Sequence, residues 1–481
     1  MTQISFSQGT IYPDSITHHN NTTYALTKLA ASGEKRLLIQ GNTSEFVGKV
    51  VNDMLVCKLT AVNAATLRTR LPWLNPVPLG RQTSFGFGDR LGIATPGHIA
   101  SLRAAIQGKP IAPIFAQQSV RENTRTGRTP QGVLDDAMWG VFQEGWRDLW
   151  GADADHVKEV ADLDPFVAAG YTFYTIDPSD YVDNEAQTDD AATLRQRAQR
   201  LPWERLGTTY AAMFAQYCSE PLQAGELMLD FDETIFLRAL VKYGRAIGHT
   251  AVIAQSLNEQ MAGQVYDLEM SVDETDTPTS IHEHYFIANE LIRRNIPIVS
   301  LAPRFVGKFQ KGVDYMGDIA QFETELVKHV AILHHFDRYK LSIHTGSDKF
   351  SIYGIINKQA QGYVHVKTAG TSHLEILRVV AVHNPPFFRR ILDLAHGRFQ
   401  TDRKTYYIDC QPEKVPFGRQ LADAQMPALL EDFNARQLLH VTFGSILDVY
   451  GSELHAFAAA HEADYRAGLE RHFARHLRPF S

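Results

Sequence analysis

The chain has few cysteines, no long apolar run and no excess of positive charge, and each absence excludes a class of protein. Cys57, Cys218 and Cys410 lie far apart with no paired spacing, which argues against a disulfide framework or a thiolate zinc site. No stretch reaches about 18 uninterrupted apolar residues, so the sequence predicts no membrane span. The net charge of −7 gives no general attraction to nucleic acid or to anionic lipid.

The amino terminus and the glycine-rich segments exclude two further features. The opening segment lacks a basic start followed by an apolar core, so we expect no signal peptide and predict a cytoplasmic location. Phe85-Gly-Phe-Gly88 lacks the third glycine and the following helix of a dinucleotide fingerprint, and no Walker motif is present. The missing motifs predict that there is no nucleotide cofactor. The net charge and the absence of a long apolar run predict no nucleic-acid partner and no membrane partner. The sequence leaves the oligomeric state open.

The length of 481 residues and the hydrophobic content of 44% allow a large buried core. The sequence predicts three parts: an N-terminal region (1–80), a catalytic domain (81–385) with a helical insertion (190–262), and a helical C-terminal extension (386–481). In the first part, Lys35–Gln40 and Met54–Leu59 resemble short strands. The proline-rich segment Leu71–Gly80 then interrupts regular structure and is typical of a linker.

From Thr83 onward, short apolar runs alternate with helical stretches, which predicts parallel strands joined by crossover helices. The eight predicted strands are Ser84–Gly88, Ile111–Ala116, Trp150–Asp155, Thr172–Ile176, Val265–Met270, Pro297–Leu301, Lys340–His344 and Tyr363–Lys367. Helical patterns over Thr193–Tyr217 and Glu233–Met261 make the insertion between the fourth and fifth strands. The predicted fold class is therefore α/β, a (β/α)8 barrel.

In such a barrel the chemistry lies at the carboxyl ends of the strands. The third predicted strand ends in Asp155 and His156, and an imidazole beside a carboxylate is a common setting for a metal and for proton transfer. Taken alone, this pair favours the simpler interpretation that Asp155 caps the next helix and His156 is a surface residue. His344 and His365 end two other strands and Glu269 ends the fifth, so we interpret the three histidines jointly as candidate ligands of zinc, manganese, nickel or cobalt.

Many other polar residues follow the predicted strands, and the basic ones among them predict an anionic ligand such as a carboxylate or phosphate. A structural salt-bridge network is the alternative. Ser347 lies in a Gly/Ser/Thr turn that could bind an anion through backbone N–H groups or simply cap a helix. The candidate substrate-binding residues are Asp89, Arg90, Gln118, Lys158, Asp177, Arg304, Lys308, Ser347, Lys349 and Lys367.

Five separated motifs between about Ser84 and Tyr407 resemble the tagaturonate/fructuronate epimerase family, whose relatives can also act on free ketohexoses. These motifs are Ser84-Phe-Gly-Phe-Gly-Asp-Arg90 with Ala94-Thr-Pro-Gly-His98, Gly151-Ala-Asp-Ala-Asp-His156, Phe173-Tyr-Thr-Ile-Asp-Pro-Ser179, Lys340-Leu-Ser-Ile-His-Thr-Gly-Ser-Asp-Lys349 and His365-Val-Lys-Thr-Ala-Gly-Thr371. The resemblance implies a metal-dependent barrel epimerase, an isomerase that acts on a small-molecule sugar acid or ketose of hexuronate catabolism.

The Asp-His pair also resembles that of metal-dependent class II aldolases, which implies that His156 holds the metal and Asp155 moves protons. Glu269 becomes the opposing acid or base, and His344 and His365 complete the metal set. The alternative is that His365 contacts the substrate and that Glu269 or another group is the third ligand.

The chemistry of this reaction favours reversible carbon–carbon cleavage. The inverted carbinol is β to the ketone, so enolisation cannot invert it, whereas retro-aldol cleavage, rotation of the aldehyde and aldol re-formation can. A divalent cation chelated by the ketone and a neighbouring hydroxyl would stabilise the enediolate. Transient oxidation by a nicotinamide ranks second. A class II-type aldolase of a keto sugar acid and a non-catalytic sugar-binding barrel remain as rival classes.

Overall fold

The computed structural model describes residues 4–106, 108, 110–368 and 370–481, with the side chain of Thr405 left out. Eight parallel strands close into a barrel in the order β10-β13-β14-β15-β16-β7-β8-β9. The strands are β7 Ser84–Gly88, β8 Ala112–Ser119, β9 Gly151–Val157, β10 Phe173–Ile176, β13 Asp267–Ser271, β14 Ile298–Ala302, β15 Lys340–Ile343 and β16 Val364–Thr368. All eight predicted strands are present, with ends that differ by up to three residues from the predicted ones.

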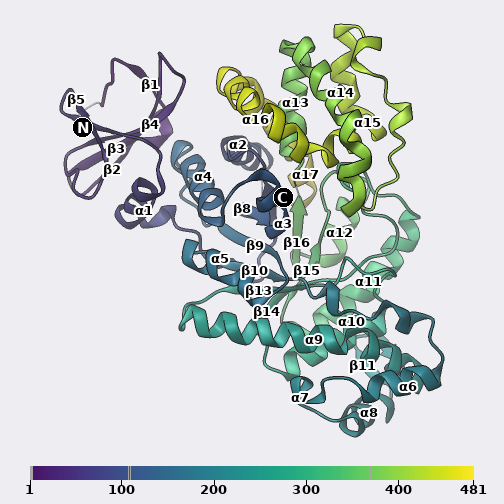
Figure 1. Ribbon diagram of the computed structural model, residues 1–481. Coiled ribbons are helices and arrows are strands. Elements are labelled where there is room, and N and C mark those ends of the chain that lie inside the picture. The colour runs from purple at the N-terminus through teal and green to yellow at the C-terminus, as the bar shows by residue number, and fades with distance from the viewer. Residues whose placement is uncertain (1–3, 107, 109, 369) are drawn as a thin grey trace.

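Helices surround the barrel in the βα order that the sequence predicts (Figure 1). They are α2 Thr95–Ala105, α3 Val120–Thr126, α4 Pro130–Gln143, α5 Leu163–Ala169, α9 Glu233–Met261, α10 Ile281–Arg293, α11 Ile319–Phe336, α12 Tyr353–Ala360 and α13 Ser372–His383. The long helix α9 has the predicted bounds because Asp232 caps its first turn and Ala262 adopts a left-handed conformation just after its end. The predicted (β/α)8 fold is confirmed.

In the structure, the predicted insertion is made of several short elements before α9 and is not one continuous helix. Between β10 and α9 lie α6 Ala191–Gln199, α7 Trp203–Leu206, α8 Tyr210–Cys218 and a small hairpin of β11 Leu222–Ala224 and β12 Leu227–Leu229. Pro202 and Gly207 interrupt the helical pattern that the sequence shows from Thr193 to Tyr217. These elements lie at one end of the molecule, at the bottom of Figure 1.

The N-terminal part is a six-stranded antiparallel sheet, of which the sequence predicted two strands. Its elements are β1 Gly9–Ile11, β2 Thr17–His19, β3 Thr22–Leu29, β4 Lys35–Gln40, β5 Gly48–Val51, β6 Met54–Cys57 and the helix α1 Ala61–Arg70. The sheet projects to one side of the barrel in Figure 1. Lys28 and Lys35 form ion pairs with Glu462, at 3.1 and 2.7 Å, and so connect the sheet to the C-terminal helices.

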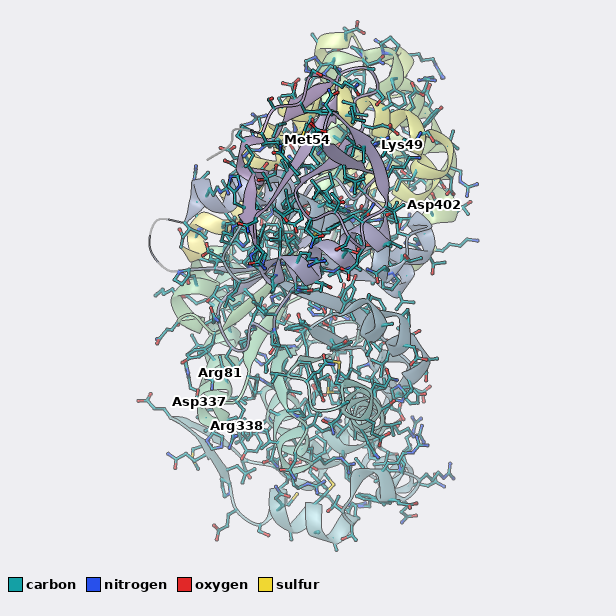
Figure 2. The ribbon with its side chains drawn as sticks, turned by 90° about the vertical axis from the view of Figure 1, so that its left-hand side faces the viewer. Lys49, Met54, Arg81, Asp337, Arg338 and Asp402 are labelled. Atoms are coloured by element: carbon teal, nitrogen blue, oxygen red, sulfur yellow. The ribbon has the colours of Figure 1, made fainter. Side chains whose placement is uncertain are left out.

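The predicted linker closes the amino-terminal end of the barrel. Its last backbone N–H groups, at Leu79 and Gly80, donate to the Asp267 carboxylate at 2.6 and 2.9 Å. Lys340 Nζ donates to the carbonyls of Gly80 and Gln82, both at 2.8 Å. Just after the linker, Arg81 pairs with Asp337 in the turn before β15, at the barrel edge where Figure 2 labels both residues.

The C-terminal extension is helical, as predicted, with α14 Pro385–Asp402, α15 Phe433–Val441, α16 Phe443–Ala460 and α17 Glu462–Leu477. Its helix α17 packs directly along α2 of the barrel. A side chain at Gly97 would put its Cβ 2.5 Å from Leu469 Cβ, so glycine is required for this close approach. No helix within the described ranges is long and apolar enough to cross a membrane.

Candidate active site and cation group

A bulge in β9 brings Asp155 and His156 to the same site. In a regular strand, neighbouring side chains point to opposite faces. The pairing of β9 with β10 shifts by one residue between Tyr174 and Ile176, and His156 adopts a left-handed φ of 54°. A bulge of this kind re-aims one side chain. The pair therefore lies within a strand that continues to Val157, whereas the sequence placed it at the strand end.

Asp177, at the end of β10, orients the His156 ring. His156 Nδ1 lies 3.1 Å from Asp177 Oδ2, and the other oxygen of Asp177 accepts from Ser179 N at 3.0 Å. A carboxylate on Nδ1 leaves Nε2 as the nitrogen for a ligand, the usual arrangement of a metal-binding histidine. Burial lowers the pKa of His156, but Asp155 and Asp177 outweigh this effect and raise the pKa to about 10.

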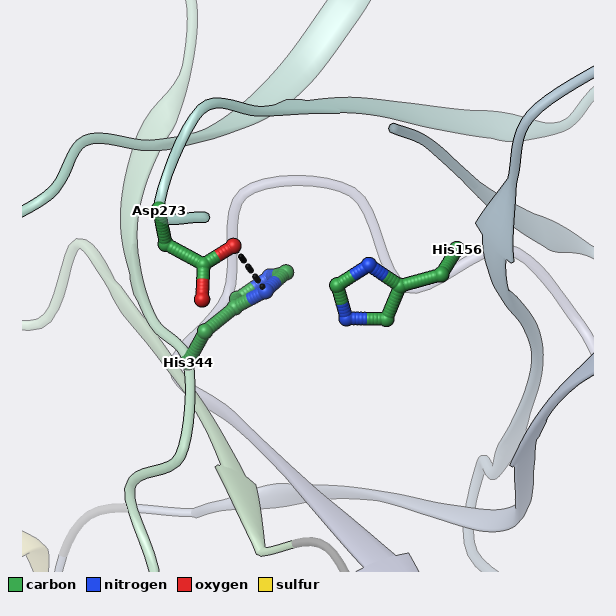
Figure 3. A group of neighbouring side chains, drawn as sticks. All are labelled: His156, Asp273 and His344. Carbon is green, nitrogen blue, oxygen red and sulfur yellow. Dashed lines mark ion pairs between the residues drawn. The ribbon is translucent and has the colours of Figure 1, made fainter. Parts of the chain in front are cut away.

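His344 lies across from His156, with ring centroids 5.2 Å apart, and both rings face the same space as Asp273 (Figure 3). His344 Nε2 lies 2.6 Å from Glu269 Oε1, while His344 Nδ1 lies 3.1 Å from Asp273 Oδ1. Burial lowers the pKa of His344, but the carboxylates of Asp273 and Glu269 outweigh this effect and raise the pKa to about 9.

The hydrogen bonds of His344 indicate that a positive charge, a proton or a metal cation, belongs between its ring and Asp273. If Nε2–H donates to Glu269, a neutral His344 presents a lone pair at Nδ1 to the Asp273 carboxylate, and two acceptors then face each other. Either a proton on Nδ1 or a cation between the two atoms removes this repulsion. Suitable ligand atoms of His156, Asp273 and His344 lie within 4.8 Å of one another. This donor set suits zinc, manganese, nickel or cobalt.

Below this group, Lys367 occupies the centre of the barrel. Its Nζ lies 2.8 Å from Asp153, 2.9 Å from Asp155 and 3.1 Å from Glu269. Burial lowers the pKa of Lys367, but the three carboxylates raise it well above its usual value. Burial also raises the pKa of Asp153 to about 7, against the opposing effect of Lys367. Barrel interiors are usually filled by branched apolar side chains, so this charged layer departs from the usual packing of the fold.

The two proposed acid/base carboxylates are exposed to different degrees. Asp155 is 6% exposed, and Lys367 is the cation closest to it. Glu269 is fully buried, with one oxygen beside His344 and Lys367 and the other accepting from Ser300 Oγ at 2.5 Å. Burial raises the pKa of Glu269, but Lys367 and His344 lower it well below its usual value.

His365 is not part of the cation group. It lies toward the amino-terminal end of the barrel, with Nδ1 2.8 Å from Ser84 Oγ and its ring 5.4 Å from that of Phe173. Burial lowers its pKa well below the usual value, so the imidazole is neutral. Its position in mid-strand, one residue after the start of β16, is the reason that it does not reach the carboxyl end.

Several candidate substrate residues are engaged elsewhere in the fold. Asp89 caps the turn before α2, accepting from the N–H groups of Leu91, Gly92 and Ala94, and Gln118 accepts and donates within the α3 region. Arg90 is buried against Glu122 at 2.7 Å and stacks on Phe443.

The remaining candidate substrate-binding residues lie at the rim of the barrel, in the protein interior or in the wall of a cavity. Lys158 donates to Ser179 and Asp180 at the rim. Ser347 is buried, as is Lys349, whose Nζ donates to three backbone carbonyls. Only Arg304 and Lys308 line the cavity described next.

A cavity of about 400 Å³ opens above Asp273 and His344. Its wall holds four cationic side chains, which favour an anionic ligand such as a carboxylate. Sequence reasoning identified Arg304 and Lys308 but not Lys311, which lies further along the same segment after the sixth predicted strand. It also passed over Tyr406 and Tyr407 of the C-terminal extension. The main lining residues are Arg121, Asp273, Glu274, Arg304, Lys308, Lys311, His344, Tyr406 and Tyr407.

Sequence reasoning also missed Asp273 as a ligand and Asp153 as a member of the charged layer. Asp273 could have been found from its position, because it lies two residues after the end of β13 and next to Glu274. Asp153 lies within the small-residue run before Asp155, and the period-two alternation of a strand places both side chains on the same face.

Fold and site together define a (β/α)8-barrel enzyme with a candidate cation group and buried carboxylates at the carboxyl ends of its strands. The family model of UxaE, tagaturonate epimerase, matches residues 12–480. The chain therefore belongs to the tagaturonate epimerase family, and it is an isomerase.

Individual relatives agree with this assignment. A Thermotoga maritima protein named tagaturonate/fructuronate epimerase is 44% identical over 391 residues, which are 81% of this chain and 79% of that protein. The native crystal structure of fructuronate-tagaturonate epimerase UxaE from Cohnella laeviribosi has a TM-score of 0.92 and 37% identity, covering 98% of this chain and 97% of that one. A glycerol complex of the same protein gives the same TM-score and identity.

Proposed function

We propose that this isomerase interconverts D-tagaturonate and D-fructuronate by retro-aldol cleavage and aldol re-formation. A single observation carries the proposal: a cation group of two histidines and an aspartate lies beside a separate acid/base carboxylate, Asp155, at the carboxyl end of the barrel. The membership of the epimerase family supports the reaction and its hexuronate substrates. The mechanism rests on the chemistry of the residues.

His156, His344 and Asp273 are the residues that would hold the divalent cation. When bound, a cation at this position supplies Lewis-acid stabilisation of negative charge on nearby substrate oxygens. Asp177 and Glu269 contribute by fixing the two imidazole rings, since each carboxylate takes one ring nitrogen and leaves the other directed at the shared space.

Asp155 is the proposed proton-transfer group that contacts the sugar. A carboxylate removes the proton from the hydroxyl on the carbon β to the ketone, and the electron pair of the adjacent carbon–carbon bond moves to the ketone fragment. The products are an enediolate and an aldehyde that stay in the cavity. Rotation of the aldehyde presents its other face, the bond re-forms, and a carboxylic acid returns a proton to the new alkoxide.

The second proton-transfer group is either Glu269 or Glu274. Glu269 remains the proposed partner of Asp155, and Lys367 links the two carboxylates, with its Nζ 3.1 Å from Glu269 and 2.9 Å from Asp155. Glu274 lines the cavity directly, and among the described residues its one ion pair is with Arg121, at 3.9 Å. Glu269→Gln and Glu274→Gln separate the two: we expect the kcat of Glu269→Gln to fall at least ten times more than that of Glu274→Gln.

The test of the proposed function is the rate of tagaturonate–fructuronate interconversion in wild type and Asp155→Asn. We expect the wild type to interconvert the two sugars, and the variant to lose the activity while it keeps its metal content. We expect neutral ketohexoses to react with a much higher KM because they lack the carboxylate that the cavity cations attract. Full activity of Asp155→Asn would remove this residue from the reaction.

A further inference from the structure

The cavity wall contains a cation whose side chain has no protein partner but whose backbone is tightly fixed. Among the described residues, Lys311 Nζ forms no hydrogen bond or ion pair, although it lies in the cavity and is only partly exposed. An ammonium group held away from water without a counter-ion costs free energy, so such a group indicates an anionic ligand. Burial also lowers the pKa of Lys311 below its usual value.

The residues on both sides of Lys311 are held through their carbonyl groups. Lys349 Nζ donates to the carbonyls of Gln310 and Val313, at 2.9 and 2.6 Å. Arg436 Nε donates to the carbonyl of Gly312 at 2.6 Å. Two buried cations from distant parts of the chain therefore fix this short segment, and Lys311 is the residue that it presents to the cavity.

The other cations of the cavity wall are less suited to bind an anion. Lys308 is already paired with Asp409 at 2.8 Å and its side chain is 44% exposed. Arg121 lies 3.9 Å from Glu274 and over the Tyr406 ring. Within the described part of the chain, Arg304 forms no ion pair and no buried cation donates to the carbonyls of its two neighbours, while its own backbone N–H donates to Thr279.

Lys311 also lies on the correct side of the cavity. The charged groups that act on it are Arg121, Glu122, Glu274 and Asp273. Asp273 belongs to the candidate cation group, so Lys311 and that group border the same space. A hexuronate bound with its ketone end at the cation group would extend its carboxylate toward Lys311.

We propose that Lys311 binds the carboxylate of the hexuronate substrate, and that Lys349 and Arg436 position it by holding the backbone on either side. This proposal rests on the proposed function. It assigns to Lys349 a positioning role instead of the direct substrate contact that the sequence predicted. It also gives the C-terminal extension, through Arg436, a part in substrate specificity.

The test compares Lys311→Met with Lys311→Arg, with Lys308→Met as a matched control on the same wall. We expect Lys311→Met to raise the KM for fructuronate about 10- to 100-fold, the loss typical of one charge-assisted hydrogen bond, with kcat within about threefold of wild type. Lys311→Arg should recover part of the loss, and Lys308→Met should change KM less than about threefold. The inhibition constant of fructose, which has no carboxylate, should be the same in all variants.

Two results would overturn the proposal. If Lys311→Met leaves the KM for fructuronate unchanged while Arg304→Met raises it, Arg304 binds the carboxylate. If Lys311→Met lowers kcat with KM unchanged, Lys311 acts on the reaction and not on binding. Arg436→Lys tests the positioning step: we expect a smaller rise in KM with the fructose inhibition constant unchanged, whereas a purely structural role would lower kcat and the melting temperature together.

Calorimetry with fructuronate separates this proposal from the proposed function. A wild type that binds fructuronate but does not interconvert it contradicts the proposed function alone, provided that Lys311→Met weakens this binding. A wild type that is active, with Lys311→Met equally active and equally tight in binding, contradicts the carboxylate assignment alone. A wild type that neither binds nor converts fructuronate contradicts both.

Discussion

Among the described residues, three groups of one aspartate and two histidines could hold a metal ion. One of them, His383, His461 and Asp464, lies at the surface, and the other two behave in opposite ways. The site group is His156, Asp273 and His344 at the carboxyl ends of the barrel strands, and the buried group is Asp348 together with His472 and His476 of α17. In the site group the pKa values of both histidines are raised, whereas in the buried group burial lowers them to about 4 and about 3.

The difference arises from the neighbours of each group and not from its residue types. In the buried group, Arg436 lies 3.0 Å from Asp348 and offsets its charge. His476 accepts from Asp348 N at 2.9 Å, and its other nitrogen lies 2.9 Å from the carbonyl of His472. The protein therefore satisfies both nitrogens of His476 and leaves no lone pair for a metal. In the site group, Asp177 and Glu269 each take one ring nitrogen and leave the shared space open.

The largest expected effect concerns Asp155, the carboxylate that lies beside the site group. We expect Asp155→Asn to reduce kcat by about 100- to 10,000-fold, because the amide cannot accept the hydroxyl proton. The measurement is kcat for fructuronate together with metal content by elemental analysis. A loss of metal in parallel with the loss of rate would show that Asp155 supports the cation group and does not transfer the proton.

A matched pair of carboxylate variants tests the comparison itself. We expect Asp273→Asn to weaken metal binding about 100-fold, since it removes a charged ligand, and to leave the fold intact. Asp348→Asn should leave metal binding unchanged and destabilise the protein by about 3 kcal/mol, because Arg436 would stay buried without its partner. Metal titration and thermal unfolding measure the two effects. Reversed outcomes would make the buried group the metal site.

A smaller effect is expected for the carboxylate that orients His156. Asp177→Asn should weaken metal affinity about 10- to 100-fold, because the ring loses the acceptor that fixes its orientation and tautomer. Glu159→Gln, on the nearby rim, serves as a control without contact to His156. An affinity equal to wild type in Asp177→Asn would exclude this orienting role.

The smallest expected effect is the acid sensitivity of the buried group. Burial lowers the folded-state pKa of His472 to about 4 and of His476 to about 3, below the value of about 6.5 in an unfolded chain. The unfolded state therefore binds more protons between pH 6.5 and 4, and stability falls as the pH falls through this window. We expect a loss of about 1–2 kcal/mol per histidine at pH 5, measured by urea unfolding. His476→Gln should flatten this dependence.

Most of the barrel could be predicted from sequence because each strand is a short apolar run between turn residues. The N-terminal sheet was harder, since β1, β2 and β5 are short strands with mostly exposed or half-exposed residues. The domain boundaries stay predictions. The bulge at His156 could not be foreseen, because a left-handed φ at a histidine has no sequence signal.

The candidate site was predicted in part. Position at a strand end brought His156 and His344 together, but it also included three residues with other partners. His365 lies toward the amino-terminal end of the barrel, and Arg90 and Lys349 are buried against Glu122 and against backbone carbonyls. Sequence shows which residues follow a strand but not how far a side chain reaches or which partner it meets. Lys311 was missed for the same reason: its position depends on contacts from Lys349 and Arg436, which are distant in sequence.

The most direct test of the account is interconversion of tagaturonate and fructuronate after chelation, followed by separate addition of manganese, zinc, nickel and cobalt. We expect chelation to abolish the interconversion and one of these metals to restore it, with no restoration in Asp273→Asn. Interconversion that persists after complete metal removal would contradict the assignment of His156, Asp273 and His344 as the metal-binding group.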